Sequence, residues 1–279
     1  MDKIIIKRYN RNDYLLTDNG YWVRDYTKIS NPIDINSLID ESDYRLFVEN
    51  QITNRTNYLA NIDAETIYAP NVVIISDGYQ YEDKQQLLSK LSKKVIFIGT
   101  NHSLARRKEN TRLDYFIVNN PYGECISYLP KTNYYPKCVT SCRTLPLFIE
   151  KYKRRKGVMY QYTPTPDKKF GAYTESQSYY VDDYRNPVCA AISLAFHWQA
   201  QKILLFCCDD SFKDERPAAE QLENGLWTYP QQRISHGLID GMLYWFKNSN
   251  KEMVIRSHSS GADYKYAPYI SSDELLRFF

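Results

Sequence analysis

The sequence predicts an α/β protein: a Rossmann-like, doubly wound, mostly parallel sheet with an N-terminal β-hairpin and helix as an appendage. Short apolar runs such as Val72–Ser76 and Lys202–Cys208 alternate with segments of helical pattern, which is typical of parallel strands buried on both faces and joined by helices. The second run is too short to span a membrane, and it is followed by two acids, Asp209 and Asp210. Because ligands bind beyond the carboxyl ends of the strands in such sheets, we expect a site at that edge.

The composition is that of an ordinary globular protein. Of 279 residues, 43% are hydrophobic and 25% are charged, and the net charge is +3, so bulk electrostatics favour neither a nucleic-acid partner nor a membrane surface. No run reaches the length of a transmembrane helix. Charged residues follow Met1 at once, and none of the six cysteines forms a C-x-x-C pair. We therefore expect a cytoplasmic protein with reduced thiols and without a signal peptide.

The first 68 residues are predicted to form the appendage. Residues 1–30 have the pattern of a hairpin, with a strong turn signal at Asp18-Asn19-Gly20. Asn31-Pro32 breaks this pattern. A helix is then expected from Ser37 to about Asn61, because apolar residues recur there on one face.

Residues 69–279 are predicted to form the main α/β domain. The predicted strands, in chain order, are Val72–Ser76, Lys93–Gly99, Leu113–Asn120, Tyr135–Ser141, Gly157–Tyr162, Lys202–Cys208 and Glu252–Ser257. Helices are expected at about Glu82–Lys93, after the loop Thr100–Glu109, from Pro146, from Asn186-Pro187, at Tyr229–Lys247 and at Ser272–Phe279.

Three loops at predicted strand ends carry groups suited to a nucleotide. The sequence lacks the G-x-G-x-x-G and G-x-x-x-x-G-K-[ST] fingerprints, so these loops are the phosphate, base or sugar candidates. Backbone N–H groups before a helix can bind an anion, and an arginine can grip a phosphate with two hydrogen bonds. Plain helix capping is the alternative for each loop. The candidate nucleotide-binding residues are Thr100, Asn101, His102, Ser103, Asn119, Asn120, Ser141, Arg143 and Thr144.

Two acids and two histidines are the candidates for catalysis. Asp209 and Asp210 could hold Mg²⁺ or a substrate hydroxyl, or could simply cap the next turn. His236 and His258 are candidate general acids or bases, since histidine titrates near neutral pH. A histidine on a helix surface or in a loop without a catalytic role is the alternative for each.

A family resemblance rests on the phrases VVIISDG, KKVIFIGTNHSLAR and LDYFIVNNP, followed by SCRTLPLFIEKYK and NPVCAAISLAFHWQAQKILLFCCDD. This order resembles the DUF115 group over about Asn71–Ser211. That group includes archaeal 6-hydroxymethylpterin diphosphokinase and motility-associated glycosyltransferases. The first strand is followed here by Ser76-Asp77-Gly78-Tyr79, where the family usually has Gly-Pro-Ser-Leu. The layout is also similar to the bacterial sialyltransferase-type fold, which uses a nucleotide sugar without a bound metal.

The resemblance implies a nucleotide-dependent transferase, and three hypotheses follow. The first is a glycosyltransferase that moves a sugar from a nucleotide sugar to a small-molecule or glycan acceptor. The absence of an Asp-x-Asp motif and the 26 tyrosines, which suit stacking on sugars or bases, favour it. The second is a Mg²⁺-dependent diphosphokinase of the 6-hydroxymethylpterin type, with Asp209 or Asp210 on the metal. The third is a non-catalytic binding or assembly protein on a transferase-like scaffold.

Overall fold

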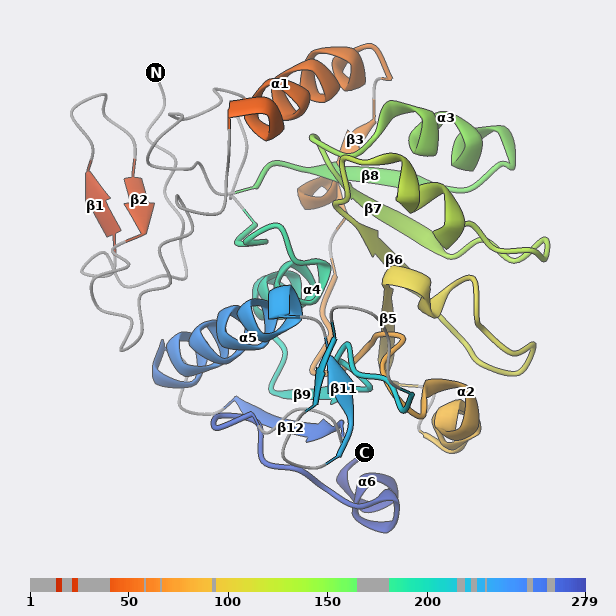
Figure 1. The fold of residues 1–279 in the computed structure, drawn as a ribbon, viewed down its shortest axis with the longest axis vertical. Coiled ribbons are helices and arrows are strands. Elements are labelled where there is room, and N and C mark those ends of the chain that lie inside the picture. Colours follow the sequence, from red (N-terminus) through yellow and green to blue (C-terminus); the bar gives the residue numbers. More distant parts are fainter. Residues whose placement is uncertain are drawn as a thin grey trace.

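The chain folds around one central sheet in the computed structural model (Figure 1). The residues that the structure describes are 14–16, 22–24, 41–57, 59–65, 67–91, 94–164, 181–214, 219–221, 225–228, 230–249, 253–259 and 264–279.

The sheet has eight strands in the order β12-β9-β4-β5-β6-β7-β8-β3, and every neighbouring pair is parallel. Its strands are β3 (Ala60–Asn61), β4 (Asn71–Ile75), β5 (Ile96–Thr100), β6 (Tyr115–Val118), β7 (Lys137–Ser141), β8 (Met159–Tyr162), β9 (Lys202–Phe206) and β12 (Val254–His258). The predicted α/β sheet is confirmed. Its apolar runs are strands because each is buried on both faces, as in Ile203, Leu204 and Leu205, which are wholly inaccessible.

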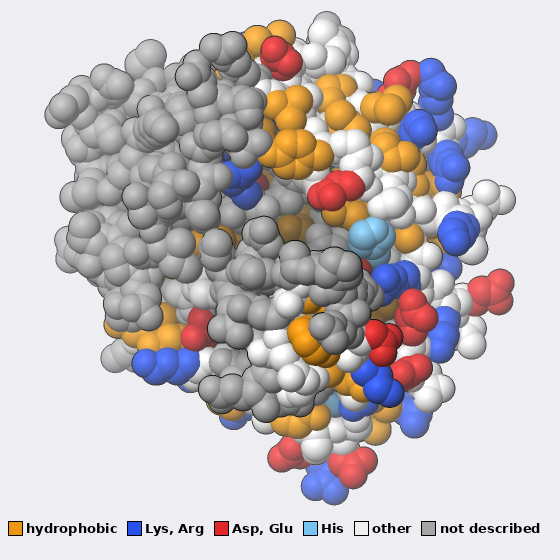
Figure 2. All heavy atoms as spheres, in the orientation of Figure 1, with side chains coloured by type: hydrophobic (Ala, Val, Ile, Leu, Met, Phe, Trp, Pro, Cys, Tyr) orange, Lys and Arg blue, Asp and Glu red, His pale blue; other side chains and the backbone are white. Residues whose placement is uncertain are grey.

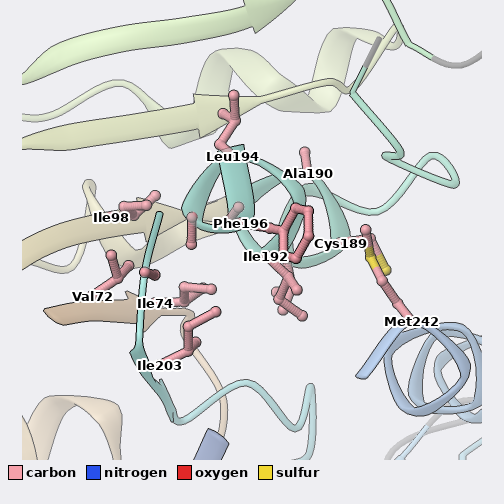
Figure 3. Packing of buried hydrophobic residues seen from close by; sticks show 14 of the residues in the cluster. Val72, Ile74, Ile98, Cys189, Ala190, Ile192, Leu194, Phe196, Ile203 and Met242 are labelled. Atoms are coloured by element: carbon pink, nitrogen blue, oxygen red, sulfur yellow. The ribbon is translucent and has the colours of Figure 1, made fainter. Parts of the chain in front are cut away.

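Helices cover both faces of this sheet. One face packs on α4 (Pro187–His197) and α5 (Pro230–Ser249), and Figure 3 shows α4 between the strand residues Val72 and Ile203 and Met242 of α5. Asn186 caps α4 by accepting the N–H groups of Val188 and Cys189. The other face packs on α3 (Pro146–Arg154), α6 (Ser272–Phe278) and the segment that combines α2 (Tyr81–Lys84) with the 3-10 helix η5 (Gln85–Lys90).

The N-terminal segment differs in part from the predicted appendage. Strands β1 (Tyr14–Leu16) and β2 (Trp22–Arg24) pair antiparallel, as expected for a hairpin, while the predicted turn at Asp18-Asn19-Gly20 is outside the described residues. Helix α1 (Glu41–Arg55) ends before the expected Asn61. The reason is that Ala60 and Asn61 form β3, which pairs with β8 at the edge of the main sheet.

The connection between β5 and β6 contains no α-helix among its described residues, although one was expected after the loop Thr100–Glu109. Only the 3-10 turn η6 (Asn101–Ser103) forms. The buried side chain of Gln85 holds the rest of this connection, because its Oε1 accepts the backbone N–H of Lys108 at 2.7 Å and the hydroxyl of Thr111 at 2.9 Å. Hydrogen bonds to the Gln85 side chain therefore hold this connection in place of the backbone hydrogen bonds of a helix.

Two short elements complete the fold. The strands β10 (Glu220–Gln221) and β11 (Trp227–Thr228) form a small antiparallel sheet that the sequence analysis did not predict.

Among the described helices, none is both long and apolar enough to cross a lipid bilayer.

The strand order places a topological switch point at β4 and β9. From β4 the chain adds β5, β6, β7 and β8 on one side, then returns through α4 to place β9 on the other side of β4. The helices that follow β4 and β9 therefore pack on opposite faces of the sheet, α2 and η5 on one and α5 on the other. In open α/β sheets, the crevice at such a point is where ligands bind.

Candidate functional site

The loops after β4 and β9 are in direct contact at the switch point. The N–H of Gly78 donates to the carbonyl oxygen of Cys207 at 2.9 Å, and the Asp209 carboxylate packs directly on the Cα of Gly78. A Cβ atom at position 78 would overlap with Asp209 Oδ1 and would lie 2.6 Å from the Cys207 carbonyl oxygen. Only glycine fits here, so the Asp-Gly pair that follows β4 has a steric role at the site.

The loop after β9 is held in an unusual backbone conformation. Cys207 and Asp210 have φ angles of 53° and 46°, which is the left-handed region that non-glycine residues rarely adopt. Such residues cost on the order of 1–3 kcal/mol each and persist only where the surroundings fix them. Such residues are common at active sites, so residues 207–210 are a candidate for one.

Hydrogen bonds from other described segments of the chain fix this loop. Besides the Gly78 bond, His236 Nε2 lies 2.5 Å from the carbonyl oxygen of Asp209 and donates to it. The N–H of Cys208 donates to Ser259 Oγ at 2.9 Å, and the Tyr264 hydroxyl donates to the Cys208 carbonyl. These partners come from the loop after β4, from α5 and from the segment after β12, so three parts of the chain hold one turn.

The two adjacent acids have different environments. Asp209 is fully buried, and its Oδ2 accepts the hydroxyl of Ser211 at 2.9 Å. Asp210 is only partly buried. Burial, followed by the negative charges of Asp77 and Asp209, raises the pKa of Asp210 from 3.8 to about 7. Asp209 is therefore suited to positioning the turn, whereas Asp210 can exchange a proton near neutral pH.

The two catalytic histidine candidates also lie in different environments. His236 is half-buried on α5, touches the Tyr264 ring edge-on at 5.9 Å and holds the Asp209 carbonyl, so it belongs to the switch-point site. His258 is 3% exposed and packs between the rings of Phe206 and Tyr269. Burial lowers the pKa of His258, and the charge of Lys84 lowers it further, against the opposing effect of the hydrogen bond to Ile270.

The buried position of His258 argues against its expected role as a general base. Its Nδ1 lies 2.9 Å from the Ile270 carbonyl and donates to it, which leaves Nε2 as an unprotonated, buried atom. Among the described residues this Nε2 has no hydrogen-bond partner. The imidazole stacks as a neutral aromatic ring in the core, because the sandwich of Phe206 and Tyr269 leaves it almost no exposed surface.

The loop after β5 joins the switch point through β4. The Asn101 side chain, on a residue with a φ of 51°, donates to Ser76 Oγ at 3.3 Å. His102 Nδ1 lies 3.3 Å from Asp77 Oδ2, and His102 Nε2 lies 2.9 Å from Ser127 Oγ. Thr100 and Ser103 are wholly buried, and the Thr100 hydroxyl donates to the Ile75 carbonyl. Of the four candidates in this loop, Asn101 and His102 are therefore the two at the surface.

Positive charge also lies at this edge. Arg106 Nη1 is 3.9 Å from Asp77 Oδ2 and 3.4 Å from the Asp77 carbonyl oxygen. Lys84 is near enough to act on two buried groups: burial raises the pKa of Cys207 and the charge of Lys84 opposes that rise, whereas burial lowers the pKa of His258 and Lys84 adds to that effect. On the face shown in Figure 2, a histidine side chain lies exposed to the right of centre with acidic and basic side chains around it.

The loop after β7 does not offer the predicted phosphate cradle. Four consecutive backbone N–H groups, those of residues 142–145, already donate to the Tyr162 carbonyl, Ser141 Oγ, the Ser141 carbonyl and the Asn120 carbonyl. The Thr144 hydroxyl donates to the Val118 carbonyl. These groups close a turn between strands, so the loop has no amide donors to spare for an anion.

Helix α1 covers this same loop. The side-chain N–H groups of Asn50 donate to the carbonyls of Pro121 and Arg143, and those of Asn54 donate to the carbonyls of Cys142 and Thr144. The Arg143 guanidinium lies over the Phe47 ring of α1 at 5.7 Å. Arg143 is thus part of a packed interface with α1, which is a different environment from the open phosphate contact that we expected.

The remaining candidates lie between these two regions. Asn120 forms an Asx turn by accepting the Tyr122 N–H at 2.8 Å, and its amide donates to Glu124 and to the Tyr128 hydroxyl. Asn119 is buried next to the Tyr162 hydroxyl. With about 4.8 Å between neighbouring strands, β7 is about 19 Å from β9, which also separates Ser141 and Arg143 from the acids after β9.

The structure therefore brings together Asp209, Asp210, His236, Asn101 and His102, and it separates the acids after β9 from the candidates after β7. Two functional candidates were missed. Asp77 and Gly78 read as a turn signal after a strand, and only the strand order shows that this turn meets the loop after β9. An acid directly after a buried strand was the available signal, and it is the same one that identified Asp209 and Asp210.

The described side chains do not form a complete metal cage. Among the residues that the structure describes, no group of three or more His, Cys, Asp or Glu side chains is arranged to hold an ion. Mg²⁺ commonly takes only one or two protein carboxylates and completes its shell with phosphate oxygens and water. Asp210, and Asp77 at the same edge, fit that smaller requirement.

Comparisons with known proteins assign no family. Neither a scan against protein-family models nor searches of curated proteins and of solved structures find a significant match to this chain.

Proposed function

We propose that this chain is a nucleotide-dependent transferase with its active site at the switch point between β4 and β9. The reaction that we favour is glycosyl transfer from a nucleotide sugar to a hydroxyl of a small-molecule or glycan acceptor. The observation that carries the proposal is the partly exposed Asp210, with a pKa of about 7, on a strained turn at the point where the strand order of the parallel sheet reverses. Carboxylates with such values cluster at functional sites.

Asp210 has the role of general base. A base is most effective when its pKa is near the working pH, because it is then available as a carboxylate and still holds a proton well. The acceptor oxygen attacks the anomeric carbon, its proton passes to Asp210, and the bond between that carbon and the nucleotide phosphate breaks. Asp209, Gly78 and His236 act on this step by fixing the turn that carries Asp210.

The departing nucleotide gains negative charge, which needs a cation nearby. Arg106 and Lys84 lie at the same edge, and an arginine can pair with phosphate oxygens by two hydrogen bonds. Asn101, at the end of β5, adds a side-chain amide for the phosphate or sugar. These residues take the phosphate-binding part that the sequence analysis gave to Arg143.

A diphosphokinase is the second candidate function. It is favoured by the proximity of Asp77 and Asp209 to Asp210, because both negative charges add to the effect of burial in raising the pKa of Asp210. A Mg²⁺ ion would relieve this repulsion and would bring ATP phosphates to the same place. Asp210 would then be a metal ligand, and its pKa would fall on metal binding.

A ligand screen by thermal unfolding separates these reactions. The full chain is heated with nucleotides and nucleotide sugars, each with and without Mg²⁺. Binding to the folded state alone raises the melting temperature by mass action, with about 2.7 kcal/mol of stabilisation at a hundredfold excess over Kd. A shift with a cytidine or uridine sugar in the absence of metal supports glycosyl transfer, and a shift that needs Mg²⁺ with ATP supports the diphosphokinase.

The variant Asp210→Asn completes the test. It should abolish turnover of the donor found in the screen, by at least about 100-fold, and should leave the folded state intact. Asp273→Asn, an exposed acid in the first turn of α6, is the matched control and should retain activity. The absence of a shift with every nucleotide, or full turnover in Asp210→Asn, would remove the proposed function and leave the non-catalytic binding protein.

A further inference from the structure

Three side chains next to the switch point are connected in the order of a nucleophile, a base and an orienting acid. Ser127 Oγ lies 2.9 Å from His102 Nε2, and His102 Nδ1 lies 3.3 Å from Asp77 Oδ2. In serine hydrolases the same two imidazole nitrogens face the same two partners, and the carboxylate holds the ring so that Nε2 can take the serine proton. The arrangement is recognised by this geometry whatever the chain order.

The three residues come from three separate elements. Asp77 follows β4, His102 is in η6 after β5, and Ser127 is in the 3-10 helix η7 (Gly123–Tyr128) after β6. Three neighbouring strands thus deliver one member each. The His102 ring is fixed further by Tyr128, whose ring meets it edge-on at 4.6 Å with an interplanar angle of 79°.

Accessibility fits a reactive group. Ser127 is exposed, the His102 side chain is 40% exposed and the Asp77 side chain is 15% exposed. A substrate can therefore reach the serine, while the acid that orients the base is mostly sheltered from water. Arg106 Nη1 lies 3.9 Å from the same Asp77 Oδ2 that His102 faces, and Arg106 Nε lies 3.7 Å from Glu82, so the acid also has a cationic neighbour.

We propose that Ser127, His102 and Asp77 form a hydrolytic site for activated carboxylic esters, which adjoins the nucleotide site and shares His102 and Asp77 with it. Ser127 Oγ forms a bond to the carbonyl carbon, and its proton passes to His102 Nε2. The bond to the leaving alcohol breaks, and that alcohol takes the proton from His102. Water then repeats the sequence on the acyl-serine, which releases the carboxylic acid and restores the serine hydroxyl.

The same molecule contains a matched serine without a histidine. In the free protein Ser127 Oγ lies 2.7 Å from the Glu124 carbonyl as well as 2.9 Å from His102 Nε2, so its single proton must turn from that carbonyl to the imidazole before the reaction. Ser89, in η5, is also exposed and donates to the Gln86 carbonyl at 2.7 Å. Both serines therefore have the same local bond three residues back in a 3-10 helix, and His102 and Asp77 are the difference between them. Any excess reactivity of Ser127 measures their effect.

The test uses a fluorophosphonate probe, which labels activated serines, followed by peptide mapping, together with hydrolysis of p-nitrophenyl acetate. The full chain is compared with Ser127→Ala, His102→Gln, Asp77→Asn and Ser89→Ala. Labelling should map to Ser127. It should vanish in Ser127→Ala, fall at least about 100-fold in His102→Gln, the usual contribution of a general base, and fall in Asp77→Asn. Ser89→Ala should match the unaltered chain.

Two controls keep the outcome unambiguous. Far-UV circular dichroism and the melting temperature check that each variant is folded, and Ser127→Ala, at an exposed position, serves if Asp77→Asn does not fold. Labelling that is absent in the unaltered chain, equal at Ser89 and Ser127, or unchanged in His102→Gln would overturn the proposal. Because Ser127→Ala leaves Asp210 and its turn untouched, a nucleotide-induced thermal shift should persist in it whichever way the probe result falls.

Discussion

The loops after β9 and after β7 begin from the same kind of sequence and end in opposite situations. Each follows a buried parallel strand with a run of polar residues, Cys208-Asp209-Asp210-Ser211 in one case and Ser141-Cys142-Arg143-Thr144 in the other. After β7, the described amides are all used within the fold, and α1 covers the carbonyls. After β9, the partly exposed Asp210 carboxylate is held where burial and the charges of Asp77 and Asp209 disfavour its ionised form.

The two loops differ in how well the fold provides partners for their polar groups. Buried polar groups are normally hydrogen-bonded, and a loop whose groups all have partners is stable and has little left for a ligand. A loop that brings acids together is less stable than it could be, and such stored energy is common where a protein binds or reacts. Polar residues at a strand end thus indicate a site only where the fold leaves some of their requirements unmet.

The largest expected effect that tests this contrast is the pH dependence of stability at Asp210. Its pKa is raised from 3.8 to about 7 in the folded state, so between these values the folded protein holds a proton that the unfolded chain has lost. Stability therefore falls as the pH rises through this window, by on the order of 4 kcal/mol in total. Asp210→Asn does not titrate and should lack this component.

The measurement is urea unfolding of both proteins at intervals from pH 4 to pH 8. The free energy of unfolding of the unaltered chain, minus that of Asp210→Asn, should decrease steadily across the range. A difference that stays constant with pH would mean that Asp210 is an ordinary exposed acid, and the contrast between the two loops would then lose its energetic basis.

Gly78→Ala should have the next largest effect. The new methyl group would overlap with the Asp209 carboxylate and press on the Cys207 carbonyl, so the β4 and β9 loops must separate. We expect a loss of about 3 kcal/mol, the upper part of the range for overpacking. Gly123→Ala is the control, because nothing lies within 4 Å of its Cβ position, and it should change stability by less than about 0.5 kcal/mol.

Chemical denaturation of the two alanine variants provides the comparison, with nucleotide-induced thermal shifts as a second readout. If Gly78→Ala is as stable as Gly123→Ala, the two loops do not depend on close contact. The strained turn after β9 would then need another explanation.

Local patterns predicted the framework of this fold because the signals lie within single segments. Val72–Ser76 and Lys202–Cys208 are apolar enough to be buried on both faces, and Asn186-Pro187 marks the start of α4 through a cap and a first-turn proline. The helix expected after β5 is absent from the described residues because Gln85, on another segment, supplies the hydrogen bonds for that connection.

The candidate site was predicted only in part, because its residues are assigned by strand order. Asp209 and Asp210 follow an obvious strand, but nothing local says that β9 lies beside β4 rather than beside β8. That pairing gives Asp77 and Gly78 their place, and it separates Arg143 by four strand spacings. Likewise, the partners of the β7 loop come from α1, 88 to 93 residues away along the chain for Asn54 and Asn50, a distance at which no local motif is informative.

Asn54→Ala tests the other half of the contrast and should have the smallest effect of the three. Asn54 is 1% exposed and donates to the carbonyls of Cys142 and Thr144 at 2.9 and 2.7 Å. The variant would leave both buried carbonyls without these donors, which should lower stability by about 2 kcal/mol. Thr53→Ala, on the exposed side of the same helix, should change it by less than about 0.5 kcal/mol.

The decisive comparison is between stability and ligand binding in these two α1 variants. If the β7 loop is purely structural, Asn54→Ala should lower the urea midpoint and leave the nucleotide-induced thermal shift of the same size as in Thr53→Ala. A variant that keeps its stability but loses the nucleotide shift would place the ligand at the β7 loop. That result would mean that binding depends on the contacts between α1 and the β7 loop. The β7 loop would then be the binding site, and the turn after β9 would have only a structural role.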